Sequence, residues 1–527
     1  MKPFALTLLS ALAPAFAMAA VDPLLFPKDR FTEEGRNVKT PSGEKKVTVH
    51  VYRHLLYVAK PVDKDYQSLD VTVPVEVDGK PVDASRAPIL FRIGVGGYMS
   101  VNNARGGGPG GRMGGPGGPP GAPGGPGGPP GGPGGPGGTP GGPGMAGPPR
   151  FPAMGGPPRG NRNTSGNVDL ALAAGFVVVA PGCRGRDNKA ADGTNFGKAP
   201  AAIVDLKAAV RYLRHNAGVM PGNMDWIVST GVSAGGALSA LLGASGNSPL
   251  YDPYLKEIGA ADAKDDIFAS ADFCPITDLE HADIAYEWMF GGLPARNGMP
   301  DQELSGQLKQ AFAAYQASLK LQGRNGFGVL TADNYGAYLL EAYLFPSANR
   351  FLKSLSEDKR KEYLASNPWI TWSADGARFT FPDYLKHIGR MKGLPAFDDF
   401  EARQPEPNEF GNKTTDNRHF TLFSLRHATG DANAALDRDI PALLNLMNPM
   451  YFIGRNNPGM AGHWWIRHGS SDKDTSLPVI VNLATSLENR KKDVNALLYW
   501  DAGHGADDDP EDFIAWVGRI TGFNARN

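Results

Sequence analysis

The chain has 527 residues, enough for one large domain with insertions or for two domains. Its formal net charge is -1 and 41% of its residues are hydrophobic, so no basic excess points to nucleic acid or an anionic membrane surface as a partner. Only two cysteines occur, Cys183 and Cys274, which excludes a disulfide framework or a zinc site built on cysteines. Each follows a predicted strand, and this favours two separate buried thiols over one disulfide.

The N-terminal segment, residues 1–20, has the features of a signal peptide. Lys2 supplies a positive start, residues 4–17 are largely apolar, and Ala17-Met18-Ala19 matches the small-x-small cleavage pattern. The apolar run is shorter than the ~20 residues that a membrane span needs, and Asp22 follows it closely. We therefore expect an exported protein, periplasmic or secreted, rather than a membrane-anchored one.

The first predicted strand, residues 88–95, leads into the glycine-rich loop Gly96-Gly97-Tyr98 and then into an unusual insertion. Gly and Pro dominate residues 105–161, but extra prolines break the strict three-residue repeat that collagen requires. Too little apolar surface is present there to offset the entropy of ordering. We expect a disordered insertion in a surface loop.

Strands and helices then alternate along the chain. A helical pattern at residues 201–214 places apolar side chains on one face. Such alternation predicts a mostly parallel sheet flanked by helices. Including the first, the predicted strands are residues 88–95, 176–181, 226–230, 267–275, 464–468 and 497–500.

The segment Gly231-Val232-Ser233-Ala234-Gly235 matches G-x-S-x-G between a predicted strand and a small-residue helix. In α/β-hydrolases this strand–turn–helix exposes a serine hydroxyl, so the context favours Ser233 as a nucleophile over a Gly/Ser-rich loop without chemistry. An oxyanion hole needs two backbone N–H groups. Ala234 supplies one, and we expect Gly97 to supply the other, with Gly96 as the alternative.

A helix-rich and aromatic-rich stretch, residues 279–459, interrupts the alternation between two late strands. Ligands in such sheets bind outside the carboxyl ends of the strands, so we expect this insertion to be a lid that sets substrate selectivity. The expected parts are a signal peptide (1–20), the first part of an α/β-hydrolase domain (21–104), the disordered insertion (105–161), the nucleophile part (162–278), the lid (279–459) and the part with the acid and the histidine (460–527).

The remaining members of a catalytic triad are expected near the C-terminus, because α/β-hydrolases follow the order Ser, acid, His. His504 is the only histidine after the last predicted strand, in Asp501-Ala502-Gly503-His504-Gly505. A carboxylate after the preceding strand would hold the imidazole tautomer and stabilise the imidazolium. Position favours Asp472 but leaves Asp474 open.

Motifs for other chemistries are missing from the sequence. There is no H-E-x-x-H and no G-x-x-x-x-G-K-[ST], and Gly94-Val95-Gly96-Gly97 lacks the third glycine of a dinucleotide fingerprint. The sequence therefore implies no metal, nucleotide or other cofactor.

Several longer strings resemble bacterial tannases (tannin acyl hydrolases), in particular their subtype B, from about residue 49 to the C-terminus outside the Gly/Pro insertion. Strings in the same order are far more specific than G-x-S-x-G alone. The resemblance is carried by Tyr66-Gln67-Ser68-Leu69, Val95-Gly96-Gly97-Tyr98-Met99, Pro181-Gly182-Cys183-Arg184-Gly185-Arg186-Asp187, Ser233-Ala234-Gly235-Gly236-Ala237-Leu238-Ser239, Ala285-Tyr286-Glu287-Trp288 and Arg467-His468-Gly469-Ser470-Ser471-Asp472-Lys473-Asp474-Thr475-Ser476.

The resemblance implies three side chains that bind the galloyl hydroxyls. Members of the family use a lysine, a glutamate and an aspartate, which by motif look like Lys392, Glu406 and Asp474 here. Asp472 is then left to orient His504. If the family motifs aligned with this sequence at slightly different positions, the residues would instead be Lys386, Glu401 and Glu409.

The implied activity is that of a serine esterase hydrolysing galloyl esters of tannins to gallic acid, with a small polyphenol ester as substrate and no nucleic acid or membrane partner. One alternative is a feruloyl or other hydroxycinnamoyl esterase with the same triad. A second is a non-catalytic binding protein on a hydrolase scaffold. A third idea makes the Gly/Pro insertion a tether that binds polyphenols, although a tolerated loop expansion is the plainer interpretation.

Overall fold

The computed structural model describes residues 22–102 and 165–523. The expected signal peptide at residues 1–20 and the Gly/Pro insertion at residues 105–161 lie outside the described residues. None of the helices within the two described ranges is long and apolar enough to cross a membrane.

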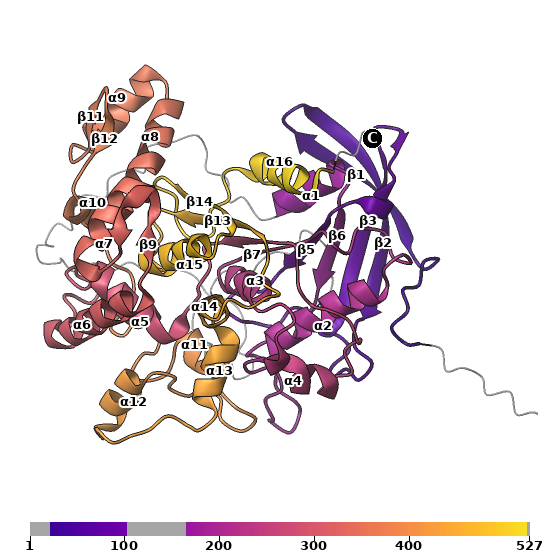
Figure 1. Cartoon of the computed structure of the whole chain (residues 1–527), viewed down its shortest axis with the longest axis horizontal. Coiled ribbons are helices and arrows are strands. Elements are labelled where there is room, and N and C mark those ends of the chain that lie inside the picture. The colour runs from indigo at the N-terminus through magenta and orange to yellow at the C-terminus, as the bar shows by residue number, and fades with distance from the viewer. Residues whose placement is uncertain (1–21, 103–164, 524–527) are drawn as a thin grey trace, which may run out of the picture.

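A mixed sheet of ten strands forms the centre of the fold (Figure 1). Its order is β1-β2-β3-β6-β5-β7-β8-β13-β14, with β4 paired to β3. The pairs from β6 to β14 are parallel and those among β1 to β4 and between β3 and β6 are antiparallel. The strands are β1 (Thr32–Thr40), β2 (Gly43–Leu56), β3 (Ser68–Val77), β4 (Lys80–Pro81), β5 (Ile89–Ile93), β6 (Val177–Pro181), β7 (Ile227–Val232), β8 (Ala269–Phe273), β13 (His463–Gly469) and β14 (Asp493–Tyr499).

Helices cover both faces of this sheet, which explains why every residue of β8 is buried. Helices α1 and α16 lie on one face of the sheet, whereas α2, α3 and α15 lie on the other (Figure 1). The apolar side chains of the first pair form a smaller core cluster, and those of the other three belong to the larger one. The helices of this body are α1 (Ser165–Ala173), α2 (Ala201–His215), α3 (Ala234–Ala244), α4 (Asp252–Glu257), α15 (Leu477–Asn489) and α16 (Pro510–Thr521).

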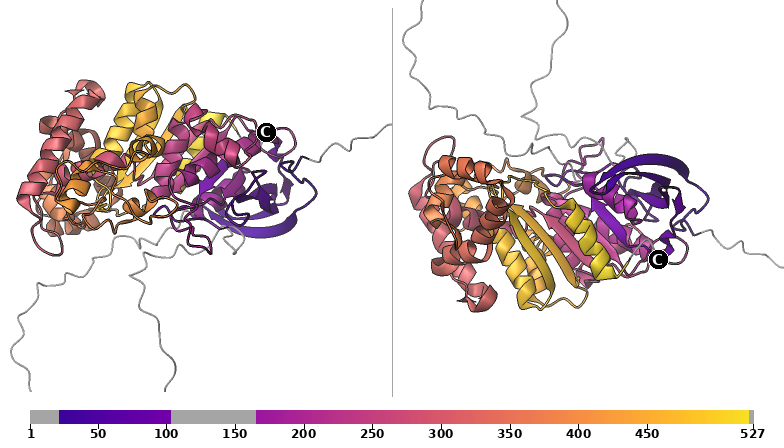
Figure 2. Two further views of the ribbon diagram at one scale, coloured as in Figure 1. Left: turned by 90° about the horizontal axis from the view of Figure 1, so that it is seen from below. Right: turned by 90° about the horizontal axis from the view of Figure 1, so that it is seen from above.

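A helical insertion separates β8 from β13 and lies toward the β13–β14 side of the sheet in each view (Figures 1 and 2). It carries two small hairpins, β9 (Gln322–Gly323) with β10 (Gly328–Val329) and β11 (Thr371–Ser373) with β12 (Gly376–Arg378). Its helices are α5 (Leu279–Phe290), α6 (Gln302–Leu319), α7 (Ala332–Leu339) with a π-helical turn at Leu340–Leu344, α8 (Phe345–Ser354), α9 (Glu357–Ser366), α10 (Phe381–Ile388), α11 (Pro405–Glu409), α12 (Leu422–Thr429), α13 (Ile440–Met447) and α14 (Pro449–Gly454).

The prediction of an α/β-hydrolase fold with a helical insertion between late strands is thereby confirmed. The parallel register then aligns the carboxyl ends of four neighbouring strands. Val232 of β7 pairs with Phe273 of β8, Phe273 with Arg467 of β13, and Arg467 with Leu497 of β14. Loops that follow these residues meet at one edge of the sheet, where ligands of such sheets bind.

Candidate active site

Ser233 lies in a strained turn between β7 and α3. Its backbone angles are φ 61° and ψ -124°, a conformation that residues other than glycine rarely adopt. A Cβ atom at Gly231 would lie 2.3 Å from the carbonyl oxygen of Gly235, and one at Gly235 would lie 2.6 Å from the carbonyl oxygen of Val95. Larger residues at either position would force α3 away from the strand ends and displace the serine.

His504 is held by Asp472 across two loops that lie against each other. His504 Nδ1 is 2.8 Å from Asp472 Oδ2. A Cβ atom at Gly469 would lie 2.2 Å from the carbonyl oxygen of Ala502 and 2.4 Å from that of Gly503. Glycine at position 469 therefore allows the loop that carries the histidine to reach the loop that carries the acid.

The loop of His504 also contacts the nucleophile turn. A Cβ atom at Gly505 would lie 3.6 Å from Cγ1 of Val232, the residue before Ser233. The Gly505 N–H donates a hydrogen bond of 3.2 Å to Sγ of Cys274, which follows β8. The ends of β7, β8 and β14 are thus joined around the candidate base.

Charges around the acid and the base favour a proton-accepting histidine. Burial opposes the Asp472 carboxylate, but His468 and His504 outweigh it and bring the pKa of Asp472 to about 2. Burial likewise disfavours the His504 imidazolium, yet the Asp472 carboxylate outweighs burial and raises the pKa of His504 above its usual value. His468 Nδ1 lies 3.5 Å from Asp472 Oδ2, and burial lowers the pKa of His468 although the Asp472 carboxylate opposes this shift.

Of the two backbone positions expected for an oxyanion hole, Ala234 lies in the nucleophile turn and Gly97 in the loop after β5. Ala234 is the first residue of α3, so its N–H has no acceptor within the helix. Gly97 has φ +54°, and its carbonyl accepts a hydrogen bond of 2.7 Å from Arg186 Nε. The alternative, Gly96, accepts the Met99 N–H at 3.0 Å and so closes the turn.

Lys392 and Asp474 form an ion pair beside the imidazole. Lys392 Nζ is 2.8 Å from Asp474 Oδ1, while Asp474 Oδ2 is 3.5 Å from His504 Nε2. The Asp474 N–H donates to Asp472 Oδ1 at 2.8 Å. The two aspartates that sequence position left open therefore lie on opposite sides of the ring, Asp472 at Nδ1 and Asp474 at Nε2.

Glu406 is a buried carboxylate in the field of the same lysine. Its side-chain Oε2 has no hydrogen-bond partner among the described residues. Burial raises the pKa of Glu406, and the Lys392 charge opposes this rise. Burial lowers the pKa of Lys392, but Glu406 and Asp474 outweigh it, so the pKa of Lys392 is raised and the ammonium stays charged.

The three alternative residues lie in different surroundings. Lys386 pairs with Asp383 and its side chain is 73% exposed, and Glu401 pairs with Arg403 at the surface. Glu409 is buried and neither of its carboxylate oxygens has a partner in the described part of the chain. Burial raises the pKa of Glu409 to about 8 despite the charges of Lys198 and Arg186.

Tyr286 was not predicted to have a role, although it belongs to one of the strings that carry the family resemblance. Its hydroxyl accepts the N–H groups of Lys392 at 3.0 Å and Met391 at 3.3 Å, and donates to the carbonyl of Lys473 at 2.9 Å. One phenol thus connects the segment of Lys392 to the residue before Asp474. No local spacing could reveal this, because the partners lie more than a hundred positions away.

A buried ion pair holds the other side of the Lys392 segment. Arg390 and Glu287 are fully buried and hydrogen-bonded to each other, with Arg390 Nη1 3.0 Å from Glu287 Oε2. Arg390 Nε also donates to the carbonyl of Lys392 at 2.8 Å. The Lys392 N–H is therefore held by Tyr286 of α5, and its carbonyl is held by Arg390.

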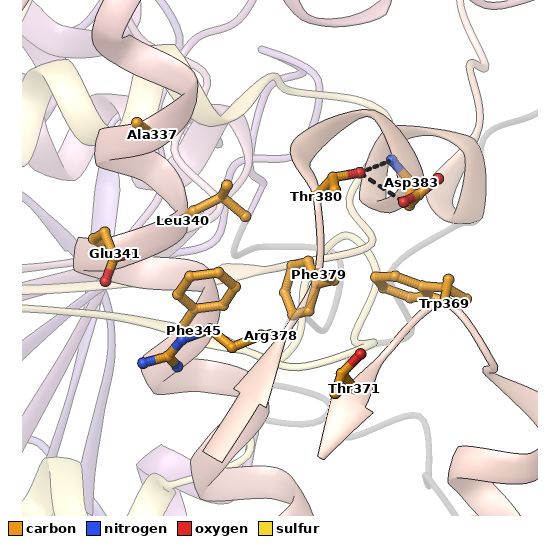
Figure 3. A pocket seen from close by; sticks show the side chains of 10 residues that line it. All are labelled: Ala337, Leu340, Glu341, Phe345, Trp369, Thr371, Arg378, Phe379, Thr380 and Asp383. Atoms are coloured by element: carbon orange, nitrogen blue, oxygen red, sulfur yellow. Dashed lines mark hydrogen bonds between the residues drawn. The ribbon is translucent and has the colours of Figure 1, made fainter. Parts of the chain in front are cut away.

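A cavity of about 540 Å³ in the insertion lies apart from these residues (Figure 3). The rings of Phe345, Phe379 and Trp369 form one side, and the Thr380 hydroxyl bonds to Asp383 at the rim. None of the triad or ion-pair residues lines it. Its aromatic wall reaches Trp500, whose ring centroid is 5.3 Å from that of Phe379.

The arrangement is suited to nucleophilic attack on a carbonyl. A strained serine, a histidine held at Nδ1 by a buried carboxylate and the free N–H groups of a helix start are the components of acyl transfer through a covalent intermediate. The acidic and basic side chains on the Nε2 side of the ring can bind polar groups of a ligand.

Parts of the chain are similar to a known family and to a known esterase. The BD-FAE family matches residues 161–310. The esterase LipQ of Mycobacterium tuberculosis (strain ATCC 25618 / H37Rv) is 37% identical over 90 residues, a stretch covering 17% of this chain and 20% of LipQ.

Solved tannases match almost the whole chain. The tannase of Fusobacterium nucleatum is 34% identical, with 94% of this chain and 99% of that chain covered at a TM-score of 0.74. A tannin acyl hydrolase in complex with ethyl gallate is 31% identical, with 94% and 99% covered at a TM-score of 0.75. Another complex, with 3,4-dihydroxybenzoate, is also 31% identical, with 95% and 100% covered at a TM-score of 0.75. With this identity over nearly the full length of both chains, the protein is a carboxylic ester hydrolase that belongs to the tannase (tannin acyl hydrolase) family.

Proposed function

We propose that this enzyme hydrolyses the galloyl ester bonds of hydrolysable tannins and simple gallate esters and releases gallic acid. The observation that carries the proposal is the group of Lys392, Asp474 and Glu406 on the Nε2 side of His504. Ethyl gallate and 3,4-dihydroxybenzoate in the solved relatives are the kind of ligand that this group suits.

The chemistry of these side chains fits a ring with several phenol hydroxyls. Carboxylates only accept hydrogen bonds, so Asp474 and Glu406 suit phenol donors. The Lys392 ammonium favours partial phenolate character at a hydroxyl beside it. The unpartnered Oε2 of Glu406 supports this assignment, because a buried acceptor without a partner costs about 1–3 kcal/mol until a donor reaches it.

The proposed reaction proceeds in two steps. His504 Nε2 accepts the Ser233 proton as Oγ attacks the ester carbonyl, and the N–H groups of Ala234 and Gly97 stabilise the oxyanion. The imidazolium then protonates the leaving alcohol and a galloyl-enzyme forms. Water activated by the same histidine cleaves this intermediate and frees gallic acid. Export through residues 1–20 to the periplasm or the medium is part of the proposal.

Release of gallic acid from methyl gallate by the purified protein, with methyl ferulate and Ser233→Ala run alongside, tests the proposal. We expect turnover of gallate but not ferulate, and loss of turnover in the variant, because the nucleophile is removed. Preference for ferulate would indicate a hydroxycinnamoyl esterase with the same triad. No turnover of either ester, together with no labelling of Ser233 by a fluorophosphonate, would indicate a binding protein.

The charges on the Nε2 side should also set the acid limb of the pH profile. Asp474 raises the pKa of His504 and Lys392 lowers it, and the base must be neutral to work. We therefore expect Asp474→Asn to move the acid limb to lower pH and Lys392→Met to move it to higher pH. The rate of fluorophosphonate labelling against pH measures both shifts without any contact to a galloyl ring, and shifts of the same sign would contradict the placement of these charges.

A further inference from the structure

We propose that Cys274, Asp472 and His504 form an inhibitory binding site for a thiophilic divalent cation such as Zn²⁺ or Cd²⁺. Their donor atoms, Sγ, a carboxylate oxygen and a ring nitrogen, all lie within 4.8 Å of one another. The inference depends on the geometry of the triad and not on the identity of the ester substrate.

The position of Cys274 follows from the sheet. It comes directly after Phe273, which pairs with Val232 on one side and with Arg467 on the other. The thiol therefore lies between the strand that leads to the nucleophile and the strand that leads to the acid. Its contact with the Gly505 N–H brings it under the loop of His504.

The spacing requires only a small closure around an ion. Zinc bonds to sulfur, nitrogen and oxygen are about 2.0–2.3 Å long, so tetrahedral donors lie roughly 3.3–3.6 Å apart. His504 Nδ1 and Asp472 Oδ2 are already 2.8 Å apart, and the thiol must approach them by about 1 Å to reach tetrahedral spacing. The His504 side chain is 30% exposed and provides the route of entry.

The charges of the three donors suit a buried dication. Asp472 is an anion, the Cys274 thiol becomes an anion on binding, and His504 binds as a neutral ring, so the two negative charges neutralise the ion. Burial raises the pKa of the Cys274 thiol, whereas a coordinated metal stabilises the thiolate. The site differs from one built on several cysteines, since a single thiol acts with a carboxylate and an imidazole.

Occupation of the site would stop catalysis through the histidine. In the resting enzyme the Nδ1 proton bonds to Asp472, whereas a metal at Nδ1 takes the lone pair there and leaves the proton on Nε2. Nε2 then cannot accept the Ser233 proton. The thiol proton leaves to solvent, so one proton is released for each ion bound. Below the thiol pKa, inhibition therefore strengthens tenfold for each unit by which the pH rises.

Labelling of Ser233 by a fluorophosphonate at increasing free Zn²⁺ tests the proposal on the purified protein. Cys274→Ser keeps an acceptor for the Gly505 N–H but removes the soft donor. We expect this variant to raise the inhibition constant at least about 100-fold, each rate being normalised to the same variant without metal. The matched control, Cys183→Ser, removes the other buried cysteine and should leave the constant unchanged.

Cadmium gives a second readout that does not depend on activity. In Cys183→Ser, the remaining cysteine should give a thiolate-to-cadmium ultraviolet band at one ion per chain, and EDTA should abolish it. This arm stays decisive if Cys274→Ser does not fold. An unchanged inhibition constant in Cys274→Ser would overturn the proposal by placing the ion elsewhere, for example between Asp474 Oδ2 and His504 Nε2, which lie 3.5 Å apart. No inhibition of the wild type by millimolar Zn²⁺, or no cadmium band, would overturn it as well.

Discussion

Asp472→Asn is expected to lower kcat by about 10⁴-fold on every ester that the enzyme accepts, as when the carboxylate of a Ser-His-Asp triad is replaced. The amide can donate a proton toward Nδ1, so His504 adopts the tautomer that carries its proton on Nε2 and cannot act as a base. The N–H groups of Asp474 and Thr475, at 2.8 and 3.3 Å, keep the acceptor oxygen in place, so the loop should survive the substitution. Single-turnover kinetics on methyl gallate and on methyl benzoate measure the loss, and circular dichroism checks the fold.

Asp474→Asn is the matched control, since it replaces the other aspartate on the same loop. It leaves the 2.8 Å contact between Asp472 and His504 intact. Asp474→Asn should lower the rate with methyl gallate and change the rate with methyl benzoate only slightly. A larger general loss for Asp474→Asn than for Asp472→Asn would exchange the roles of the two carboxylates.

The sheet could be predicted from the sequence wherever its strands are buried on both faces. The runs 176–181 and 226–230 are short and contain no charged residue, and they match β6 and β7 within two residues. No strand is predicted in residues 22–87, although β1 to β4 lie there. Thr32–Thr40 shows why: it is an edge strand rich in charged residues, and Val38 is its only fully buried residue, so it has little hydrophobic signal.

The candidate site could be predicted where its chemistry depends on local turns. Ser233 and His504 sit in short glycine-flanked loops directly after strands, and the chain order of triads leaves few other positions. The residues that hold Lys392 could not be found in this way. Tyr286 and Arg390 look like ordinary helix and loop residues, and their roles come only from backbone groups that the tertiary fold brings to them.

Tyr286 should influence substrate selectivity through the hydrogen bonds of its hydroxyl to the backbone of Lys392 and Lys473. Tyr286→Phe keeps the buried ring but removes the hydroxyl that connects Lys392 to Lys473. Its kcat/KM for methyl gallate should fall while that for methyl benzoate stays nearly unchanged. Tyr251→Phe removes a comparable buried bond, from the hydroxyl to the Leu446 carbonyl at 2.6 Å, away from the site. It should lower stability without changing the ratio between the two esters.

Glu406→Gln is expected to give the larger loss of selectivity. A hydrogen bond to a charged group contributes about 1.5–3 kcal/mol, so replacing the carboxylate with an isosteric amide should lower kcat/KM for methyl gallate by about 10–100-fold. The change for methyl benzoate should stay within about threefold, because no hydroxyl of that ring needs the acceptor. Glu409→Gln is the control, since burial already raises the pKa of Glu409 to about 8 and makes its acid form a close match to the amide at neutral pH. If kcat/KM for methyl gallate fell only in Glu409→Gln, Glu409 rather than Glu406 would be the glutamate that binds the galloyl hydroxyls. If Glu406→Gln lowered kcat/KM equally for both esters, Glu406 would have no role in substrate recognition.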